Sequence, residues 1–281
     1  MIQENILKVS NKLYKRVVFM KWSDEAKKEL SKVPFFVRKK VKIKVEDLAK
    51  ELNSEKVLPF HLAEAKNRFL NNMEKEIKGF SLEACFGEKN CKNAIKASPD
   101  FLNKIESLLL KKDILSFLKK NSKDKIKFHQ EFKVSVSFCP NSCSRPQISD
   151  IGLIAASRPV VTDEPCIKCM SCVKGCVERA VFFKNGSLLI DYEKCLFCNE
   201  CIKRCPTKTI IQEKKGFRIL AGGKLGRHPR LGKDLGEIYT ENEVLKIIDS
   251  AVDFMLSQKK GAKRFSDIFN DEIFESLKNR V

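Results

Sequence analysis

Residues 166–176 read CIKCMSCVKGC, and residues 195–206 read CLFCNECIKRCP. Both stretches have the spacing C-x2-C-x2-C-x3-C, in which a tight loop directs three thiolates at one cluster and the fourth cysteine reaches a neighbouring cluster. Zinc is the alternative, since it also binds four thiolates and often uses C-x2-C pairs. Two consecutive copies of the four-cysteine run favour iron–sulfur clusters over zinc.

The two runs resemble those of the bacterial two-cluster ferredoxins. The resemblance implies two [4Fe-4S] clusters, the first held by Cys166, Cys169, Cys172 and Cys205 and the second by Cys195, Cys198, Cys201 and Cys176. Pro206 follows the last cysteine of the second run, whereas Val177 stands at the equivalent position of the first. Because proline is not a ligand, we expect this difference to leave cluster binding intact.

Four more cysteines lie upstream in two pairs, Cys85 and Cys91 in CFGEKNC and Cys139 and Cys143 in CPNSC. Between the pairs, apolar residues recur at helical spacing opposite a lysine-rich face, at Ile105, Leu108, Leu109, Ile114, Leu115 and Leu118. From Phe132 to Phe138 apolar and polar residues alternate. This alternation predicts a strand that runs directly into Cys139.

The two pairs, with SRPQISDIG at residues 144–152 and GRHPRL at residues 226–231, resemble the siroheme–[4Fe-4S] domain of the sulfite and nitrite reductases. In that family a ferredoxin module can be inserted between these parts, as it is in this chain. The resemblance implies a third [4Fe-4S] cluster on Cys85, Cys91, Cys139 and Cys143. It implies that Cys143 is also the axial ligand of a siroheme. Cations would neutralise sulfite or nitrite and the siroheme carboxylates, and the candidates by position are Arg145, Lys224, Arg227 and Arg230.

The chain departs from that family at two places. Phe138 stands where glycine usually precedes the CPNSC motif, and we expect its ring to crowd a tetrapyrrole or to change how the cluster is approached. The family's usual N-terminal segment is not recognisable upstream of Cys85. The siroheme site is then incomplete, vestigial or finished by another chain, and these alternatives stay open. His228 is a candidate proton donor, although a lone histidine is more often structural.

Upstream stands WSDEAKKELSKVPFFVR, residues 22–38. Ser23 can cap a helix that Pro34 interrupts. The stretch resembles the small C-terminal module of the light-independent protochlorophyllide reductase subunit. The resemblance implies a lid or contact element for a tetrapyrrole or a redox partner. The alternative is a small helical domain whose own core is formed by Trp22, Val33, Phe35 and Phe36.

The 281 residues are enough for about two domains, and the formal net charge is +19. Interspersed lysines usually mark solvated helix faces, and a basic surface can also attract acidic electron carriers or anionic substrates. None of the known nucleic-acid recognition motifs is present, which argues against a nucleic-acid partner. The N-terminus lacks a signal-peptide core, and no apolar stretch approaches the roughly 18 residues of a membrane span. We therefore expect a cytoplasmic protein with reduced thiols.

Together these features predict an α+β fold with a helical module in residues 1–75, a sulfite/nitrite reductase-like domain in residues 76–162 and 214–260, a ferredoxin module in residues 163–213 and a polar tail in residues 261–281. The favoured function passes electrons from the ferredoxin clusters to the third cluster, which feeds sulfite or nitrite reduction if siroheme is bound. Two alternatives stay open, a non-catalytic electron carrier without siroheme and a partner subunit of a tetrapyrrole reductase. Redox partner proteins and a homo- or hetero-oligomer are compatible with each of these functions.

Overall fold

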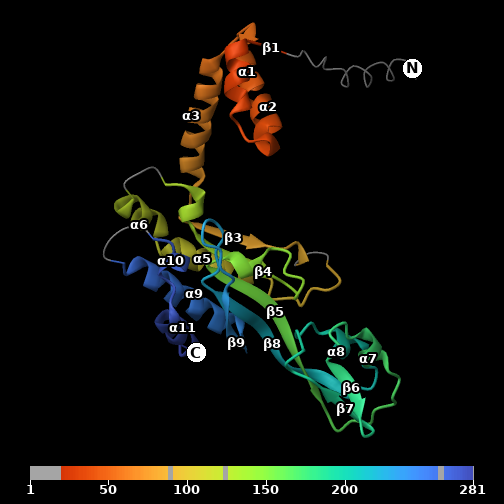
Figure 1. Ribbon diagram of the computed structural model, residues 1–281. Helices are drawn as coiled ribbons and strands as arrows, with labels where there is room; N and C mark the ends of the chain where they lie inside the picture. Colours follow the sequence, from red (N-terminus) through yellow and green to blue (C-terminus); the bar gives the residue numbers. More distant parts are fainter. Residues whose placement is uncertain (1–19, 88–90, 123–125, 259–262, 281) are drawn as a thin grey trace, which may run out of the picture. The chain divides into compact units, whose positions relative to one another are not determined.

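The computed structural model describes residues 20–87, 91–122, 126–258 and 263–280. Its contacts divide the chain into two compact units, residues 1–76 and residues 77–281. Helices and strands both contribute to the structure (Figure 1), which confirms the predicted α+β class.

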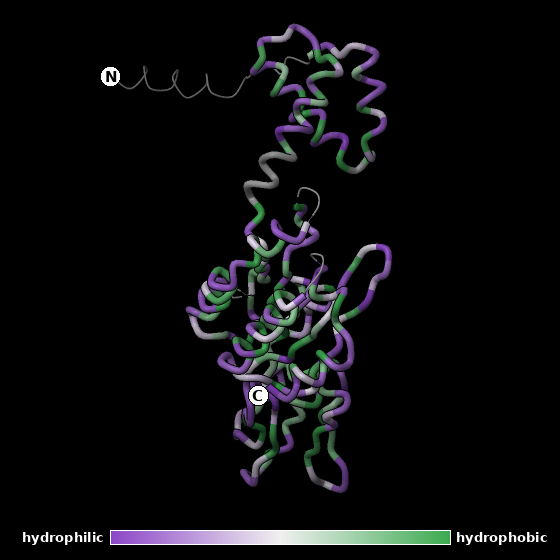
Figure 2. Tube along the Cα trace, turned by 90° about the vertical axis from the view of Figure 1, so that its left-hand side faces the viewer, coloured by the Kyte–Doolittle hydropathy of each residue, from purple (hydrophilic) through white to green (hydrophobic). Residues whose placement is uncertain are grey.

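In its described part, residues 20–76, the N-terminal unit contains three helices, α1 (Asp24–Ser31), α2 (Phe35–Glu51) and α3 (Pro59–Glu76), and a short parallel pair of strands, β1 (Lys21–Trp22) and β2 (Lys56–Val57). Ser23 caps α1 by accepting a hydrogen bond from the amide of Ala26 at 3.2 Å. Pro34 lies between α1 and α2, where its lack of a backbone N–H breaks no helical hydrogen bond. Hydrophilic residues predominate along these helices (Figure 2).

A small core holds this unit together, formed by Ala26, Val45, Ala49 and Val57. Trp22 packs against it and donates its indole N–H to Glu46 at 2.8 Å. Phe35 is 82% exposed, so the alternative in which it belongs to the core is wrong for this residue. The side chain of Phe36 lies outside the described part of the structure.

The second unit is built on a five-stranded sheet of order β3-β4-β5-β8-β9. Its strands are β3 (Phe80–Ala84), β4 (Phe132–Ser137), β5 (Ile151–Val161), β8 (Ile210–Ala221) and β9 (Lys233–Tyr239). The first three are parallel neighbours, and β8 and β9 add antiparallel pairs. The helical segment predicted around Ile105 is two helices, α5 (Phe101–Lys111) and α6 (Ile114–Asn121), separated by a left-handed Asp113. Helices α5 and α9 (Glu241–Leu256) contribute to the same core as the sheet.

The ferredoxin module, residues 162–209, is inserted between β5 and β8 (Figure 1). These two strands pair along their whole length, with a register shift between Arg158 and Pro159. The module contains α7 (Ser171–Gly175), β6 (Val181–Lys184), β7 (Ser187–Ile190) and α8 (Glu200–Arg204). The long β5–β8 ribbon therefore joins the module to the main sheet.

The C-terminal tail differs from the prediction. Residues expected to form a polar tail contain two helices, α10 (Phe265–Ile268) and α11 (Asp271–Lys278). Phe265 and Leu277 are fully buried in the main core, and Phe274 is nearly so. Apolar residues spaced three or four apart give this segment one buried face, which the high overall polarity of the tail conceals.

Candidate iron–sulfur sites

The two ferredoxin loops have the same backbone conformation at equivalent positions. Lys168 and Met170 in the first loop, and Phe197 and Asn199 in the second, have left-handed φ angles of 52°, 60°, 57° and 70°. Side chains other than glycine rarely adopt this conformation, and such residues gather at functional sites. The repeated conformation gives the two loops the same turns between their cysteines. The sequence repeat predicts equivalent loops, but of the four residues only Asn199 is of a type that favours this conformation.

The first quartet brings together Cys166, Cys169, Cys172 and Cys205. Burial raises the pKa of the Cys172 thiol, and the nearby thiols of Cys205 and Cys166 raise it further. Hydrogen bonds from Ser171 hold the pKa of Cys169 below its ordinary value. Two backbone amides donate to sulfur atoms of this quartet. Lys168 N–H donates to Cys166 Sγ and Ile210 N–H donates to Cys205 Sγ, both at 3.4 Å. Such bonds are a means by which proteins tune iron–sulfur centres.

The second quartet brings together Cys195, Cys198, Cys201 and Cys176. Burial, together with the neighbouring thiols of the other three, raises the pKa of Cys201 to about 12. A thiol in such a place becomes a thiolate only beside a bound positive centre. The amide of Ala180 donates to Cys176 Sγ at 3.2 Å. The donor set of both quartets therefore fits a cluster ligated by four thiolates.

A cavity of about 570 Å³ lies between the ferredoxin module and the main sheet. All four cysteines of the second quartet line it. Cys139, which belongs to the third quartet (Cys85, Cys91, Cys139 and Cys143), also lines it, together with the two residues that follow, Pro140 and Asn141. The first quartet does not line this cavity through any of its four cysteines. Of the two ferredoxin quartets, the second is therefore the one that faces Cys139.

Contacts between the module and the main sheet fix the position of this cavity. Ser157 N–H donates to Phe197 O at 2.8 Å, and Tyr192 donates its hydroxyl to Pro159 O at 2.9 Å. The guanidinium of Arg158 stacks over the Tyr192 ring at 4.6 Å. Lys203 Nζ donates to Lys92 O at 3.3 Å. The sequence gives no signal for these contacts, because only the folded ribbon brings residues 157–159 beside the module.

The third quartet, Cys85, Cys91, Cys139 and Cys143, lines a narrow cavity of about 20 Å³. Burial raises the pKa of the Cys139 thiol, with smaller contributions from Cys91, Cys85 and Cys143. Phe138 N–H lies 3.4 Å from Cys85 Sγ. Cys143 is exposed, whereas Cys139 is buried. These four thiols form a donor set suited to one cluster, with Cys143 open to a further ligand.

Strands β3 and β4 bring the third quartet together. They pair in parallel, with Ala84 opposite Val136, so that Cys85 and Cys139 follow neighbouring strand ends. The hydroxyl of Ser135 donates to Ser144 O at 2.6 Å, and the hydroxyls of Ser137 and Ser144 lie 2.7 Å apart. These serines hold the loop that carries Cys143. The alternation of apolar and polar residues along β4 alone would place the side chains of Ser135 and Ser137 in solvent, yet both are buried.

Phe138 lies on the buried wall of the third cavity and is 1% exposed. An added Cβ at Gly87 would lie 3.3 Å from its Cβ atom and 3.1 Å from Cys85 Sγ. Phe138 therefore belongs to the main hydrophobic core and also lines the cavity of the third quartet. That its ring crowds a tetrapyrrole or changes the approach to the cluster stays a prediction.

The basic candidates separate into two groups. Lys224 pairs with Asp267 at 2.6 Å, and Arg230 donates to the carbonyl groups of Gly222 and Ser266. Their charged groups are thus already engaged by the protein itself. Arg145, Arg227 and His228 are exposed and make no hydrogen bond or ion pair through their side chains to any residue in the described ranges.

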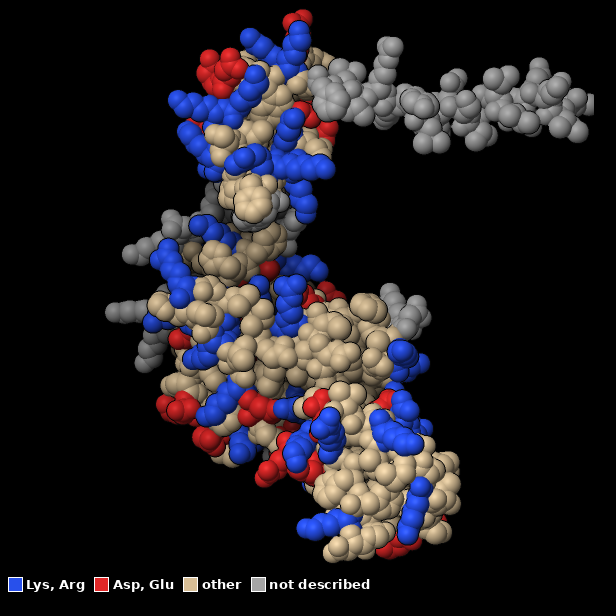
Figure 3. Space-filling view, turned by 45° about the vertical axis from the view of Figure 1, so that its right-hand side comes forward, with Lys and Arg blue, Asp and Glu red and all other residues tan. Residues whose placement is uncertain are grey.

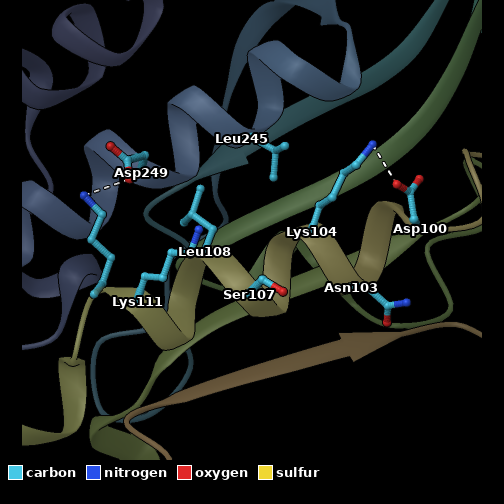
Figure 4. Close-up of a pocket in the computed structure, with 9 residues that line it drawn as sticks. Asp100, Asn103, Lys104, Ser107, Leu108, Lys111, Leu245 and Asp249 are labelled. Carbon is cyan, nitrogen blue, oxygen red and sulfur yellow. Dashed lines mark ion pairs between the residues drawn. The ribbon is translucent and has the colours of Figure 1, made fainter.

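A further hollow, of about 590 Å³, lies between α5 and α9 (Figure 4). Four of the five charged residues that line it form ion pairs, Lys104 with Asp100 at 2.9 Å and Lys112 with Asp249 at 2.8 Å. None of the cysteines lines this hollow. We therefore assign it no part in the iron–sulfur chemistry.

The positive charge of the chain lies mostly outside the ferredoxin module. Residues 162–209 contain eight Lys and Arg against six Asp and Glu. Figure 3 shows a largely uncharged surface over the module and many basic side chains elsewhere. No helix among the described residues is long and apolar enough to cross a bilayer.

Comparison with protein families gives two matches. The model described as "Nitrite and sulphite reductase 4Fe-4S domain" matches residues 80–280. The model described as "Proto-chlorophyllide reductase 57 kD subunit" matches residues 22–66. The first spans the sheet, all three quartets and most of the C-terminal segment, and the second spans most of the N-terminal unit.

Known proteins with related sequences include a coenzyme F420-dependent sulfite reductase of Methanocaldococcus jannaschii, 35% identical over 43% of this chain and 20% of its own length. An anaerobic sulfite reductase subunit of Salmonella typhimurium is 30% identical over 63% of this chain and 50% of its own. The chain thus spans half or less of these relatives. Among solved structures, dissimilatory sulfite reductase I aligns with a TM-score of 0.45 and 17% identity, over 76% of this chain and 57% of its own.

Proposed function

Because the chain belongs to the nitrite and sulphite reductase 4Fe-4S domain family, we propose that this sulfite reductase-like iron–sulfur protein conducts electrons through three [4Fe-4S] clusters to an anion-reducing centre. Cys166, Cys169, Cys172 and Cys205 would hold the cluster that accepts electrons. Cys176, Cys195, Cys198 and Cys201 would hold the second, and Cys85, Cys91, Cys139 and Cys143 the third.

The observation that carries this order is the cavity of about 570 Å³ shared by the second quartet and Cys139. It brings the ligands of the second cluster next to a ligand of the third, with Pro140 and Asn141 beside them. The bonds from Ser157 and Tyr192 keep the two parts together. Electrons would therefore leave the module from the second quartet, and the first quartet would meet the donor.

The exposed Cys143 is the proposed axial ligand of siroheme. When bound, siroheme would supply the iron at which sulfite or nitrite is reduced. Arg145 and Arg227 are the exposed cations available to offset the charge of the anion and of the siroheme carboxylates. Reduced thiols fit a cytoplasmic location, and association with other redox proteins in a larger enzyme is part of the proposal.

A non-catalytic electron carrier is the second candidate. It is favoured by the narrow cavity of about 20 Å³ at the third quartet. A tetrapyrrole-reductase partner is supported by the match at residues 22–66. Both candidates keep the ferredoxin clusters and differ in what the third quartet does.

Production in cells that make siroheme separates these functions. The proposal predicts a porphyrinoid absorption band, which iron–sulfur clusters lack, and oxidation of a reduced donor when sulfite or nitrite is added. Cys143→Ser should remove both and leave the ferredoxin clusters in place. Full cluster content without a haem band, even with siroheme and candidate partner chains supplied, would show that the protein is an electron carrier.

A further inference from the structure

Residues 224–230 form a small hairpin that is anchored to the chain following Cys143. Lys224 N–H donates to Arg230 O at 2.8 Å, and Arg230 N–H donates to Lys224 O at 2.9 Å. The tip between them is exposed, and Gly226 within it has a φ of 102°. The base lies against the chain that follows Cys143, since Gly232 N–H donates to Gln147 O at 2.7 Å. An added Cβ at Gly223 would lie only 2.3 Å from the same carbonyl oxygen.

The C-terminal segment, residues 264–278, holds the base of this hairpin. Asp267 pairs with Lys224 at 2.6 Å, and Ser266 O accepts a hydrogen bond from Arg230 at 2.6 Å. Arg230 also donates twice to Gly222 O, at 3.0 and 3.1 Å, and lies over the ring of Phe269. Gly222 has a φ of 77°, and a Cβ there would meet the Phe269 ring at 2.2 Å.

A buried carboxylate anchors the C-terminal segment to the strand that leads into Cys139. Asp150 is completely buried and accepts hydrogen bonds from Ser266 N–H and Lys133 N–H, both at 2.9 Å. Arg264 pairs with it at 3.3 Å. Because β4 carries Lys133, one carboxylate connects the C-terminal segment with the scaffold of the third quartet. Removing either partner of such a buried pair leaves an uncompensated charge.

We propose that the C-terminal segment is a positioning element, which fixes the 224–230 hairpin from behind so that Arg227 at its tip faces an anionic ligand beside Cys143. This inference rests on the proposed function for the identity of the ligand, whose negative groups are siroheme carboxylates or a sulfite-type oxyanion. Lys224 and Arg230 then serve the hairpin itself. Arg227 makes no polar side-chain contact with any residue that the structure describes, so its charge remains available.

Hydrogen exchange and ligand titration of the full chain test the two halves of this proposal. Arg230→Gln and Asp267→Asn should speed exchange of the Lys224 and Arg230 amides and weaken siroheme binding about tenfold, the loss expected for one hydrogen bond to a charged group. Arg227→Gln should weaken ligand binding to a similar degree with exchange unchanged. Asp271→Asn is the matched control, since it breaks the Lys233–Asp271 pair of 3.0 Å outside the hairpin, and it should change neither.

Two titrations distinguish the sources of the negative charge. A defect of Arg227→Gln in the absorbance titration with siroheme indicates the carboxylates, and a defect only when sulfite is added to the siroheme-loaded protein indicates the oxyanion. Unchanged exchange in Arg230→Gln and Asp267→Asn, or wild-type binding of both ligands by Arg227→Gln, overturns the proposal. A wild-type chain that binds no siroheme overturns the proposed function and the ligand half together, whereas exchange still decides whether the C-terminal segment holds the hairpin.

Discussion

In the ferredoxin module, six of the eight cysteines lie in two seven-residue loops, whereas the third quartet takes two cysteines after β3 and two after β4, with α5 and α6 between them. The module's ligands are thus arranged by local backbone conformation. Those of the third quartet depend on the pairing of strands about fifty residues apart in the chain. Four cysteine thiols can therefore be brought together by a short motif or by a complete sheet. We expect iron removal and substitutions to affect the two regions differently.

Removal of iron should produce the largest difference between the two regions. The buried core of the module is small and includes two of the proposed ligands, Cys172 and Cys201, with Val181, Leu188 and Ile210. Metal binding in such small sites supplies much of the folding free energy. After chelation, amides of β6 and β7 should lose their exchange protection, while those of β4 and α9 keep it. Protection that persists throughout residues 162–209 would contradict this prediction.

A matched pair of glycine substitutions should perturb one region without the other. An added Cβ at Gly152 would lie 2.0 Å from Pro146 O, next to the loop of Cys143, and one at Gly216 would lie 2.0 Å from Tyr239 O. Both Gly152→Ala and Gly216→Ala should lower the free energy of unfolding by about 1–3 kcal/mol, as overpacking does. Gly152→Ala alone should reduce the iron held by the third quartet. Equal iron content in the two variants, measured beside denaturant unfolding, would refute the difference.

The smallest expected effect is a pH dependence in the scaffold of the third quartet. Burial raises the pKa of Glu131, which precedes β4 and accepts the Lys78 N–H at 3.0 Å. A folded pKa above the unfolded value means that ionisation opposes folding, so stability falls as pH rises from the unfolded pKa through the folded one. Glu131→Gln should remove this slope and raise stability at neutral pH by about 1 kcal/mol. An unchanged slope in acid unfolding curves would show that Glu131 is not its source.

The two regions also differ in how much the sequence could predict. Repeated spacing predicts two equivalent loops, because local motifs carry their own geometry. It cannot predict the left-handed φ angles of Lys168 and Phe197, since neither residue type favours that conformation. The alternation in residues 132–138 predicts β4 correctly. The burial of Ser135 and Ser137 depends on the Ser144 loop folding back onto the strand, and alternation gives no sign of it.

The basic candidates and the tail show the same limit. The resemblance singles out Lys224 and Arg230 as candidate anion contacts, but their ion pair and hydrogen bonds are made with residues some forty positions later. The tail reads as polar because its apolar residues occupy one helical face only. Only the folded structure shows that the C-terminal segment meets residues 224–230, and therefore that Lys224 and Arg230 are paired within the protein.

The central claim is that the second ferredoxin cluster lies next to the third, and the magnetic interaction between reduced clusters tests it most directly. We expect about twelve irons per anaerobically purified chain, from three clusters of four, and about eight in Cys139→Ser. In the fully reduced wild type, electron paramagnetic resonance should show the second-cluster signal split by a third spin. Cys139→Ser should lose that splitting and keep the interaction between the two ferredoxin clusters. A spectrum of Cys139→Ser that lacks one signal but is otherwise unchanged in line shape would contradict the account.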